Sequence, residues 1–114
     1  MAYRSKKEPK YHAKPVQANG QRFDSRREYR RWCELKTLER AGVISNLERQ
    51  VKYTLVPAQR DCGKTIRAVS YIADFRYVQN GSTVVEDCKG YRTEVYKLKK
   101  KLMLWVHGIS IRET

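Results

Sequence analysis

Several features that mark other classes of protein are missing from this 114-residue chain. No apolar run approaches the ~20 residues that a membrane-spanning helix needs, and the polar, basic N-terminus has no signal-peptide pattern. The three cysteines, Cys33, Cys62 and Cys88, are odd in number and widely spaced, which speaks against a disulfide framework. With His12 and His107 they form no zinc-binding spacing. We therefore expect a protein of a reducing cytoplasm that has no membrane partner.

Acidic side chains are scarce, because 12 Asp and Glu stand against 25 Lys and Arg, which gives a net charge of +13. Residues 1–22 hold six Lys and Arg and one Glu, or +5. Residues 23–114 hold 19 Lys and Arg and 11 Asp and Glu, or +8. The larger part of the chain is thus basic in its own right, which favours nucleic acid as a partner ahead of an acidic membrane surface. A basic protein without such a partner is the plainer alternative.

The N-terminal segment differs in composition from the rest of the chain. Residues 1–22 are polar and basic, with two prolines and almost no apolar periodicity. Such a segment has little apolar surface to bury, so we expect a flexible basic arm. The remaining residues, 23–114, suit a single domain with one modest core.

The sequence of this domain predicts two helices and several strands. Ser25 is a good N-cap and Gly42 a natural stop, so the first helix is expected from about Ser25 to Ala41, with its apolar stripe at Trp32, Leu35 and Leu38. The other expected elements are strands at about 50–56, 68–78 and 83–89, a polar loop at 58–67, a helix from a cap at Thr93 to about Val106, and a short strand at 109–113. The order α-β-β-β-α-β, without an internal repeat, predicts an α/β fold.

The second helix carries an apolar stripe with spacings of three, four and three, at Val95, Leu98, Leu102 and Trp105. Lysines lie opposite this stripe, and the helix N-terminus follows closely after the third strand. A helix N-terminus beside cations can bind phosphate. A lysine face is also usual on a solvated helix. We expect contacts with the nucleic-acid backbone from Arg92, Tyr96, Lys97, Lys100 and Lys101.

Asn80-Gly81 stands between two strand patterns and predicts a two-residue type I′ turn. With these turn residues, the numbers of paired residues sum to 161, so Asp74 faces Asp87 across the hairpin. Because side chains alternate along a strand, Lys89 shares the face of Asp87, whereas Glu86 points to the other face.

Two carboxylates at facing positions have Cβ atoms only ~5 Å apart and repel each other. A shared proton, a cation or Lys89 must compensate. Hard oxygen ligands at this separation suit Mg²⁺ or Mn²⁺, and such an ion can hold a phosphate and acidify a bound water. A lysine nearby can orient that water or neutralise developing charge. The alternative is a plain charge cluster on an exposed sheet face, because Asp-x-Lys alone is common.

Glu28 has two possible roles. It stands three residues after Ser25, as in a capping box, and would favour the helix dipole there. It also lies on the inward stripe of its helix, from which a carboxylate could reach the sheet and join a metal site. Gln50, at the start of its predicted strand, could contact the site or pair at the strand end, and of the two we expect pairing.

Together these patterns resemble the PD-(D/E)XK nuclease superfamily, whose core is α-β-β-β-α-β. More narrowly, the chain is similar to a family of small phage and prophage proteins placed in that superfamily. The resemblance covers most of residues 19 to 101, through the stretches NGQRFDSRREYRRW, GVISNLERQVKYTL, YIADFRYV and VVEDCKGYRTEVYKLKKKL. It implies a restriction-endonuclease-like fold with a mixed central sheet flanked by helices.

The resemblance also implies roles for individual residues. Asp74 matches the first acid of the motif, although Ala73 precedes it where the motif has proline. Asp87 and Lys89 match the (D/E)-x-K part, and the Cys88 main-chain carbonyl would complete the metal shell. The remaining implied ligand is Glu28, which matches an acid that many members supply from the first helix.

The resulting expectation is a phage-encoded, Mg²⁺- or Mn²⁺-dependent DNA endonuclease. It would leave a 5′-phosphate and a 3′-hydroxyl and act in the cytoplasm of an infected or lysogenic bacterium. Holliday junction resolvases share this layout, so branched DNA is one expected substrate and a homodimer the expected assembly. The alternative is a DNA-binding or host-modulating phage protein that kept the nuclease fold without turnover. An RNA-directed protein ranks last, because no RNA-binding module is present.

Overall fold

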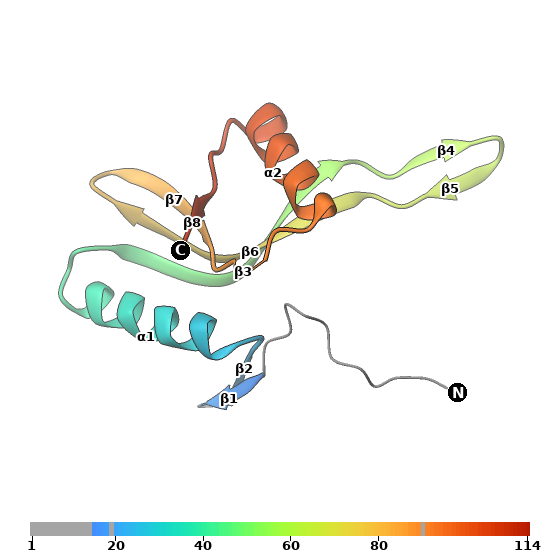
Figure 1. Ribbon diagram of the computed structural model, residues 1–114. Coiled ribbons are helices and arrows are strands. Elements are labelled where there is room, and N and C mark those ends of the chain that lie inside the picture. Colours follow the sequence, from blue (N-terminus) through green and yellow to red (C-terminus); the bar gives the residue numbers. More distant parts are fainter. Residues whose placement is uncertain (1–14, 19, 90) are drawn as a thin grey trace, which may run out of the picture.

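A four-stranded sheet forms the centre of the molecule, with one helix against each face (Figure 1). The computed structural model describes residues 15–18, 20–89 and 91–114. The elements are β1 Val16–Ala18, β2 Gln21–Phe23, α1 Arg26–Arg40, β3 Ser45–Val56, β4 Gln59–Asp61, β5 Lys64–Ile66, β6 Val69–Gln79, β7 Ser82–Asp87, α2 Glu94–His107 and β8 Arg112–Glu113.

The sheet is mixed, as predicted. Its strand order is β3-β6-β7-β8, in which β3, β6 and β7 are antiparallel neighbours and β8 runs parallel to β7. The chain reaches β8 only after crossing one face of the sheet as α2, because two parallel strands cannot be joined by a tight turn. The result is a mixed α/β fold with two helices on opposite faces (Figure 1).

Both predicted helices are confirmed, together with their caps. The Ser25 hydroxyl accepts the Glu28 N–H at 3.1 Å at the start of α1. Thr93 does the same for the Tyr96 N–H at 3.0 Å in α2, and Gly108 ends α2 in the left-handed region at φ 67°. These side chains satisfy N–H groups that the first turn of a helix leaves without partners.

The predicted hairpin register is confirmed as well. Asn80 and Gly81 have φ values of 53° and 77°, as a type I′ turn requires. The ladder pairs Gln79 with Ser82 and continues to Phe75 and Glu86. Asp74 and Asp87 stand one position beyond that last pair, while Asp87 pairs on its other side with Glu113 of β8.

Side-chain alternation changes face in the middle of β6. Tyr71 and Ala73 belong to the core cluster that includes Met103 of α2. Phe75 and Tyr77 belong to the separate cluster built on α1. All four have odd numbers, so a regular strand would place them on one face of the sheet. The strand therefore switches faces next to Asp74.

The neighbouring strand is irregular at the same point. Arg49 pairs with Phe75 and Val51 with Ala73, which leaves Gln50 opposite Asp74 without a regular pair. Gln50 has a φ of 54°, which side-chain-bearing residues adopt rarely and chiefly where the chain is irregular. The two strands thus depart from the regular ladder together at the position of the first predicted acid.

Residues 16–23 correct the prediction of a flexible arm over 1–22. β1 and β2 form a small antiparallel hairpin that pairs Val16 with Phe23. Phe23 is 1% exposed, and its ring lies against Trp32 and under the guanidinium of Arg49. The structured domain therefore includes this hairpin, while residues 1–14 lie outside the described residues.

The predicted polar loop at 58–67 is also wrong. β4 and β5 pair as a hairpin, and Cys62 and Gly63 at its turn have φ values of 51° and 78°. Every residue from 57 to 69 is exposed, and the hairpin projects away from the sheet (Figure 1). Its polar composition gave no apolar alternation from which strands could be predicted.

Three of the four residues in the predicted apolar stripe of α2 lie on the solvent side of the helix, and only Leu102 is partly buried against the core cluster. Val95, Leu98 and Trp105 are 61%, 57% and 86% exposed. Tyr96 and Met103 pack into the core in their place, at 6% and 0% exposure. α2 thus has two apolar sides, and periodicity alone does not tell which of them the sheet covers.

Candidate functional site

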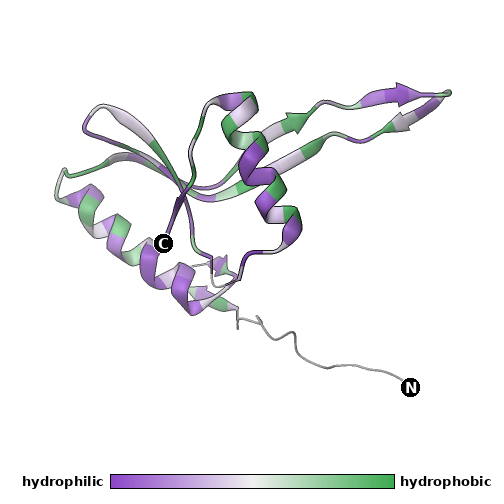
Figure 2. Ribbon diagram, turned by 45° about the horizontal axis from the view of Figure 1, so that its top comes forward, coloured by the Kyte–Doolittle hydropathy of each residue, from purple (hydrophilic) through white to green (hydrophobic). Residues whose placement is uncertain are grey.

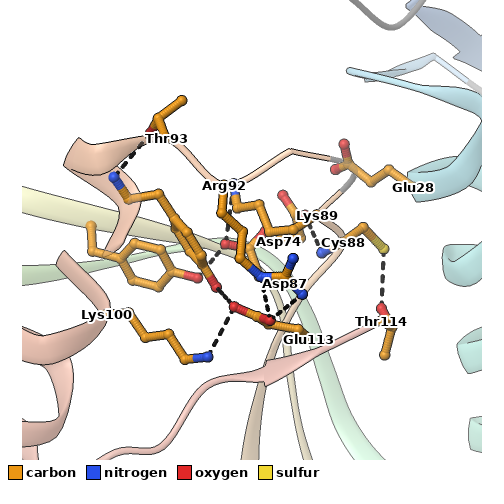
Figure 3. Close-up of polar contacts among 12 residues, drawn as sticks. Glu28, Asp74, Asp87, Cys88, Lys89, Arg92, Thr93, Lys100, Glu113 and Thr114 are labelled. Carbon is orange, nitrogen blue, oxygen red and sulfur yellow. Dashed lines mark hydrogen bonds and ion pairs between the residues drawn. The ribbon is translucent and has the colours of Figure 1, made fainter. Parts of the chain in front are cut away.

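Asp74 and Asp87 meet where the strands lose their regular pairing, as the hairpin register predicted. Asp87 is buried, at 1% exposure, and Asp74 is half-buried. The Cys88 N–H donates to Asp74 Oδ2 at 2.9 Å, which fixes one carboxylate beside the strand that carries the other. Figure 3 shows the two acids with Cys88 and Lys89 around them.

Lys89 and Tyr71 complete the surroundings of Asp87. The Lys89 Nζ lies 3.5 Å from Asp87 Oδ2 and 4.5 Å from the centre of the Tyr96 ring. The Tyr71 hydroxyl donates to the same Oδ2 at 2.5 Å. Burial, and after it the hydrogen bond to Asp87, raise the pKa of Tyr71 far above its ordinary 10. Tyr71 therefore stays a proton donor at any ordinary pH.

Ionisation of both carboxylates, Asp74 and Asp87, is unfavourable in this position. Burial raises the pKa of Asp74 to about 9, and the hydrogen bond to Asp87 and the charge of Asp87 add to this rise. Asp87 Oδ1 is buried and has no hydrogen-bond donor among the described residues. Either a proton shared with Asp74 or a cation would satisfy that oxygen.

The C-terminal strand holds the site residues in place. The Thr114 N–H donates to the Asp87 carbonyl at 3.0 Å, and the Lys89 N–H donates to the Thr114 carbonyl at 3.3 Å. These bonds continue the parallel ladder past the end of β7. The backbone at Asp87 and Lys89 is therefore fixed by residues more than twenty positions away in sequence.

Glu28 combines the two roles that the sequence left open. Its N–H is capped by Ser25, while its side-chain Oε1 accepts the Asp24 N–H at 3.1 Å, so the return contact of the capping box goes to Asp24. The Glu28 side chain is also buried, and burial raises its pKa. It enters the cluster from the α1 side (Figure 3), and its charge contributes to the raised pKa of Asp74.

The prediction that Gln50 only pairs at a strand end is wrong. Gln50 lies inside β3, and its Nε2 donates to Glu28 Oε2 at 3.2 Å. Arg49 Nη2 reaches the same oxygen at 3.4 Å. β3 begins five residues earlier than expected, at Ser45, which moves Gln50 from the edge of the strand into the site.

The predicted metal ligands do not form one compact group. Among the described residues, no three His, Cys, Asp and Glu side chains lie close enough together to hold an ion. Glu28 is engaged by Asp24, Arg49 and Gln50. Burial raises the pKa of the Cys88 thiol to about 11, so the thiolate is not the form present at neutral pH. Cys88 could serve a metal through its carbonyl alone.

Glu86 faces away from the acidic pair, as predicted. It is fully buried on the α1 side, where Arg31 Nε and Nη2 donate to its two oxygens at 2.5 and 3.0 Å and the Tyr77 hydroxyl donates at 2.6 Å. Burial alone would raise the pKa of Glu86, but the bonds from Arg31 and Tyr77 lower it below its ordinary value. Glu86 therefore forms a structural ion pair with Arg31 and is not a member of the site.

The residues predicted to contact nucleic acid come together in one groove on α2. It is lined by Arg92, Tyr96, Lys97, Lys100, Lys101, Leu104 and Glu113. Tyr96 is not an exposed contact residue, since it is 6% exposed. Its hydroxyl donates to Glu113 at 2.7 Å. Four cations and one acid leave the groove positively charged, and the bonds from Arg92 and Lys100 lower the pKa of Glu113 to about 2.

A second basic groove was not predicted. It lies on the α1 side and is lined by Arg27, Arg30, Arg31, Glu34, Cys88 and Thr114. Because Cys88 separates Asp87 from Lys89 in sequence, this groove borders the acidic pair from the face opposite α2. The run RREYRR in α1 was the signal in the sequence, but it gave no indication that its arginines would lie beside the end of β7.

Sequence reasoning also missed Tyr71 and Glu113. Tyr71 is three positions from Asp74, so regular alternation would point the two side chains to opposite faces. Their approach depends on the irregularity at Asp74. Glu113 reaches the site through the parallel pairing of β8, for which no local turn specifies a register.

The fold and the site define a mixed α/β protein with a paired-carboxylate site beside a lysine and two basic grooves. The chain belongs to the DUF1064 family, described as "Protein of unknown function (DUF1064)", whose model matches residues 8–108. Neither the curated proteins nor the solved structures include a match to it. No helix among the described residues is long and apolar enough to cross a membrane.

Proposed function

We propose that this protein is a metal-dependent DNA endonuclease of the PD-(D/E)XK type. The observation that carries the proposal is the meeting of Asp74, Asp87 and Lys89 at a break in the sheet. The order α1, β3, β6, β7, α2, β8 supports the restriction-endonuclease-like core, once the two small hairpins β1–β2 and β4–β5 are set aside.

The residues present fit a divalent cation. Asp87 Oδ1 is a buried oxygen without a donor among the described residues, and burial, followed by the hydrogen bond to Asp87 and the charge of Asp87, raises the pKa of Asp74 so that it keeps a proton. An ion held by Asp74, Asp87 and the Cys88 carbonyl would replace that proton. Mg²⁺ or Mn²⁺, when bound, would polarise a phosphodiester and acidify a water molecule. Glu28 could join only by giving up its bonds to Gln50 and Arg49.

The chain's own residues supply the rest of the chemistry. Lys89 is held between Asp87 and the Tyr96 ring, so its ammonium is fixed at the edge of the acidic pair. From there it can orient an attacking water or neutralise charge that develops on the phosphate. Tyr71 fixes the rotamer of Asp87 by its short hydrogen bond. Attack by water would leave a 5′-phosphate and a 3′-hydroxyl.

The two basic grooves support a nucleic-acid substrate. One lies on the α2 side of the acidic pair and the other on the α1 side. A duplex or a branched junction that crosses the pair would place backbone phosphates in both grooves, where cations release counterions from the strand. Two separate basic grooves suit a substrate with more than one phosphate backbone. Branched DNA is therefore the substrate that we propose to test first.

The proposal is tested by incubating the protein with supercoiled plasmid, a four-way junction, linear duplex and an RNA hairpin. Each substrate is combined with Mg²⁺, Mn²⁺ or EDTA. We expect cleavage of DNA with either metal and none with EDTA. Binding of DNA without cleavage under any metal would favour the non-catalytic DNA-binding protein, and cleavage of RNA alone would contradict the choice of substrate.

The Glu28→Gln substitution distinguishes a role of Glu28 as a metal ligand from a role as part of the helix cap. Glutamine keeps an oxygen for the Asp24 N–H but loses the negative charge. If Glu28 assists the metal, we expect cleavage to fall by roughly 10- to 100-fold, with less than about 1 kcal/mol lost in stability. The measurements are the initial cleavage rate and the melting temperature. A lower melting temperature with unchanged cleavage would assign Glu28 to the helix cap alone.

A further inference from the structure

The β4–β5 hairpin has no role in the proposed active site, although it is a prominent part of the surface. Every residue from 57 to 69 is exposed. Figure 2 shows the hairpin extending past both helices, with hydrophilic residues (purple) along β4. A two-stranded hairpin on its own is only marginally stable in water. A ribbon of this kind therefore indicates a surface that contacts another molecule.

The hairpin continues the ladder between β3 and β6 in the same register. Val56 pairs with Val69 at the end of that ladder, and Arg60 pairs with Thr65 in the hairpin. The residue numbers of both pairs sum to 125, so no residue is inserted on either strand between them. Pro57 has no N–H to donate, which accounts for the break in the hydrogen-bonded ladder at this point. Side-chain alternation can therefore be followed from the sheet into the hairpin.

This register gives the two faces of the hairpin different charges. Arg60 and Arg67 fall on the same face as Val56 and its partner, and we call this the arginine face. Asp61 pairs with Lys64 on the opposite face, where the two charges offset each other. Val56 packs against the core cluster on the α2 side. The arginine face therefore lies on the α2 side of the sheet and carries no acid.

Arg60 is held at the outer end of the arginine face by bonds within the hairpin. Its Nη2 donates to the Gly63 carbonyl at 2.8 Å, and its Nη1 donates to Thr65 Oγ1 at 3.2 Å. A guanidinium has five N–H groups, so these two bonds leave further donors for an acceptor on another molecule. The planar guanidinium matches the oxygens of a phosphate well. Arg60 can therefore bind an anionic partner without losing its own contacts.

A groove connects the proposed active site with the base of the hairpin. β6 pairs with β7 from Phe75 to Gln79, so the earlier residues of β6 lie at an edge of the sheet on this side. The groove borders this edge, and its lining includes Ser70, Tyr71, Ile72, Lys89, Thr93 and Lys99. Lys89 contacts Asp87, whereas Ser70 lies next to the residues of the hairpin. A phosphate backbone in this groove would be led from the acidic pair toward the arginine face.

The partner that this surface fits is the backbone of a nucleic acid. Residues 57–68 hold two Arg and one Lys against one Asp, which gives them a net charge of +2. They contain no aromatic residue, whereas Trp and Tyr are, with Arg, the usual anchors of protein interfaces. Basic side chains bind phosphates with release of counterions. A nucleic acid is therefore favoured over a second protein.

We propose that the arginine face binds the phosphate backbone of the DNA duplex outside the position of cleavage. This placement rests on the proposed function, because it is counted from the acidic pair. Val69 and Gly63 stand five and eleven residues before Asp74. At ~3.3 Å per residue of strand, the base and the tip of the hairpin lie up to roughly 17 Å and roughly 36 Å from that acid. Phosphates recur every ~3.4 Å along one strand, so the contacts fall roughly 5 to 10 nucleotides from the bond that is cut.

The test measures DNA binding in EDTA, so that its result does not depend on cleavage. Fluorescence anisotropy gives the affinity of the full chain for a duplex of about 8 base pairs, which covers the site alone, and for one of about 24 base pairs, which reaches past the hairpin. We expect Arg60→Gln and Arg67→Gln each to weaken binding of the longer duplex by roughly 5- to 10-fold, and of the shorter one by less than about 2-fold. Each should also reduce the dependence of log affinity on log salt concentration by about one.

Lys64→Gln is the matched control, because it removes one positive charge from the opposite face of the same hairpin. It should bind both duplexes within about 2-fold of the wild-type affinity, since a charge that makes no contact is screened by salt. Arg67→Gln guards against an effect on folding. Arg67 lies outside β5, so the bonds of Arg60 across the hairpin stay in place in that variant.

Unchanged affinity of either arginine variant for the longer duplex would overturn the proposal, and so would an equal loss with Lys64→Gln or with the shorter duplex. Cleavage with Mg²⁺ keeps this result apart from the proposed function. A wild type that cleaves, with arginine variants that bind unchanged, would reject the hairpin contact and retain the nuclease. Length-dependent binding through the arginines, without cleavage under any metal, would retain the contact and reject the nuclease.

Discussion

Asp87→Asn is expected to abolish metal-dependent DNA cleavage, with at least a 100-fold loss of initial rate, while DNA binding is largely retained. Asp87 is the residue through which Tyr71, Lys89 and the second acid are all connected. Asparagine has nearly the same shape as aspartate, and its side-chain oxygen can still accept a hydrogen bond from the Tyr71 hydroxyl. It removes the charge that would hold the metal and position the lysine.

Asp61→Asn is the matched control for this prediction. It makes the same chemical change on the exposed β4 strand, in the hairpin that projects away from the central sheet (Figure 1). We expect it to cleave like the wild type. The measurements are plasmid cleavage with Mg²⁺ and DNA affinity by fluorescence anisotropy. An Asp87→Asn protein that still cleaves at a tenth or more of the wild-type rate would contradict the assignment of the site.

Asp74→Asn is expected to make the metal-free protein more stable at neutral and alkaline pH. Burial and the neighbouring Asp87 raise the folded-state pKa of Asp74 to about 9, against an ordinary value of 3.8. Above pH 4 the unfolded chain has lost this proton while the folded chain still holds it. The free energy of unfolding therefore falls as pH rises from about 4 to 9.

Asparagine carries no such cost and keeps an oxygen for the Cys88 N–H. At pH 8 in EDTA we expect roughly 2 to 4 kcal/mol of added stability by urea unfolding, less than the full linkage value because the pair can relax. Near pH 3, where both states hold the proton, the gain should disappear. A variant that is less stable than the wild type at pH 8 would show that Asp74 is ionised and well compensated in the folded protein.

The same pair predicts the response to metal. A divalent ion that binds the folded protein alone stabilises it by mass action, by about 1.4 kcal/mol at ten times its dissociation constant. We expect Mg²⁺ or Mn²⁺ to raise the melting temperature of the wild type and to leave that of Asp74→Asn almost unchanged. Equal shifts for both proteins would place the ion elsewhere on the chain.

These effects share one physical origin. Two carboxylates are placed together in a partly buried position, which costs stability, and the proposed metal ion would relieve their repulsion. Such a cost is common where a protein holds a site ready for a charged ligand. The ion pair between the buried Glu86 and the half-buried Arg31 on the other face is the contrasting case, since each charge there is already matched.

Much of the scaffold followed from local sequence signals. Ser25 and Thr93 as caps, Gly108 as a stop and the Asn80-Gly81 turn act over a few residues, so their outcome depends on chemistry next to them in the chain. The turn also set the approach of Asp74 to Asp87. The two acids and the lysine of the site could therefore be named without any knowledge of the packing.

Other features depended on contacts between distant segments. The periodicity of α2 fits either of its two apolar sides facing the sheet. The side with Tyr96 and Met103 faces the sheet because these two side chains pack into the core cluster. Gln50 entered the site because β3 extends back to Ser45 along β6, a pairing that no turn specifies.

The two helices, the central hairpin and the facing acids could be predicted from the sequence, because caps, turns and side-chain alternation are local properties of the chain. The assembled fold was needed to show how β8 fixes Asp87, where both strands depart from the regular ladder at Asp74, and which face of α2 is left uncovered. Those features arise from packing between segments far apart in sequence, where many registers and rotations satisfy the same local pattern and only the assembled core selects one.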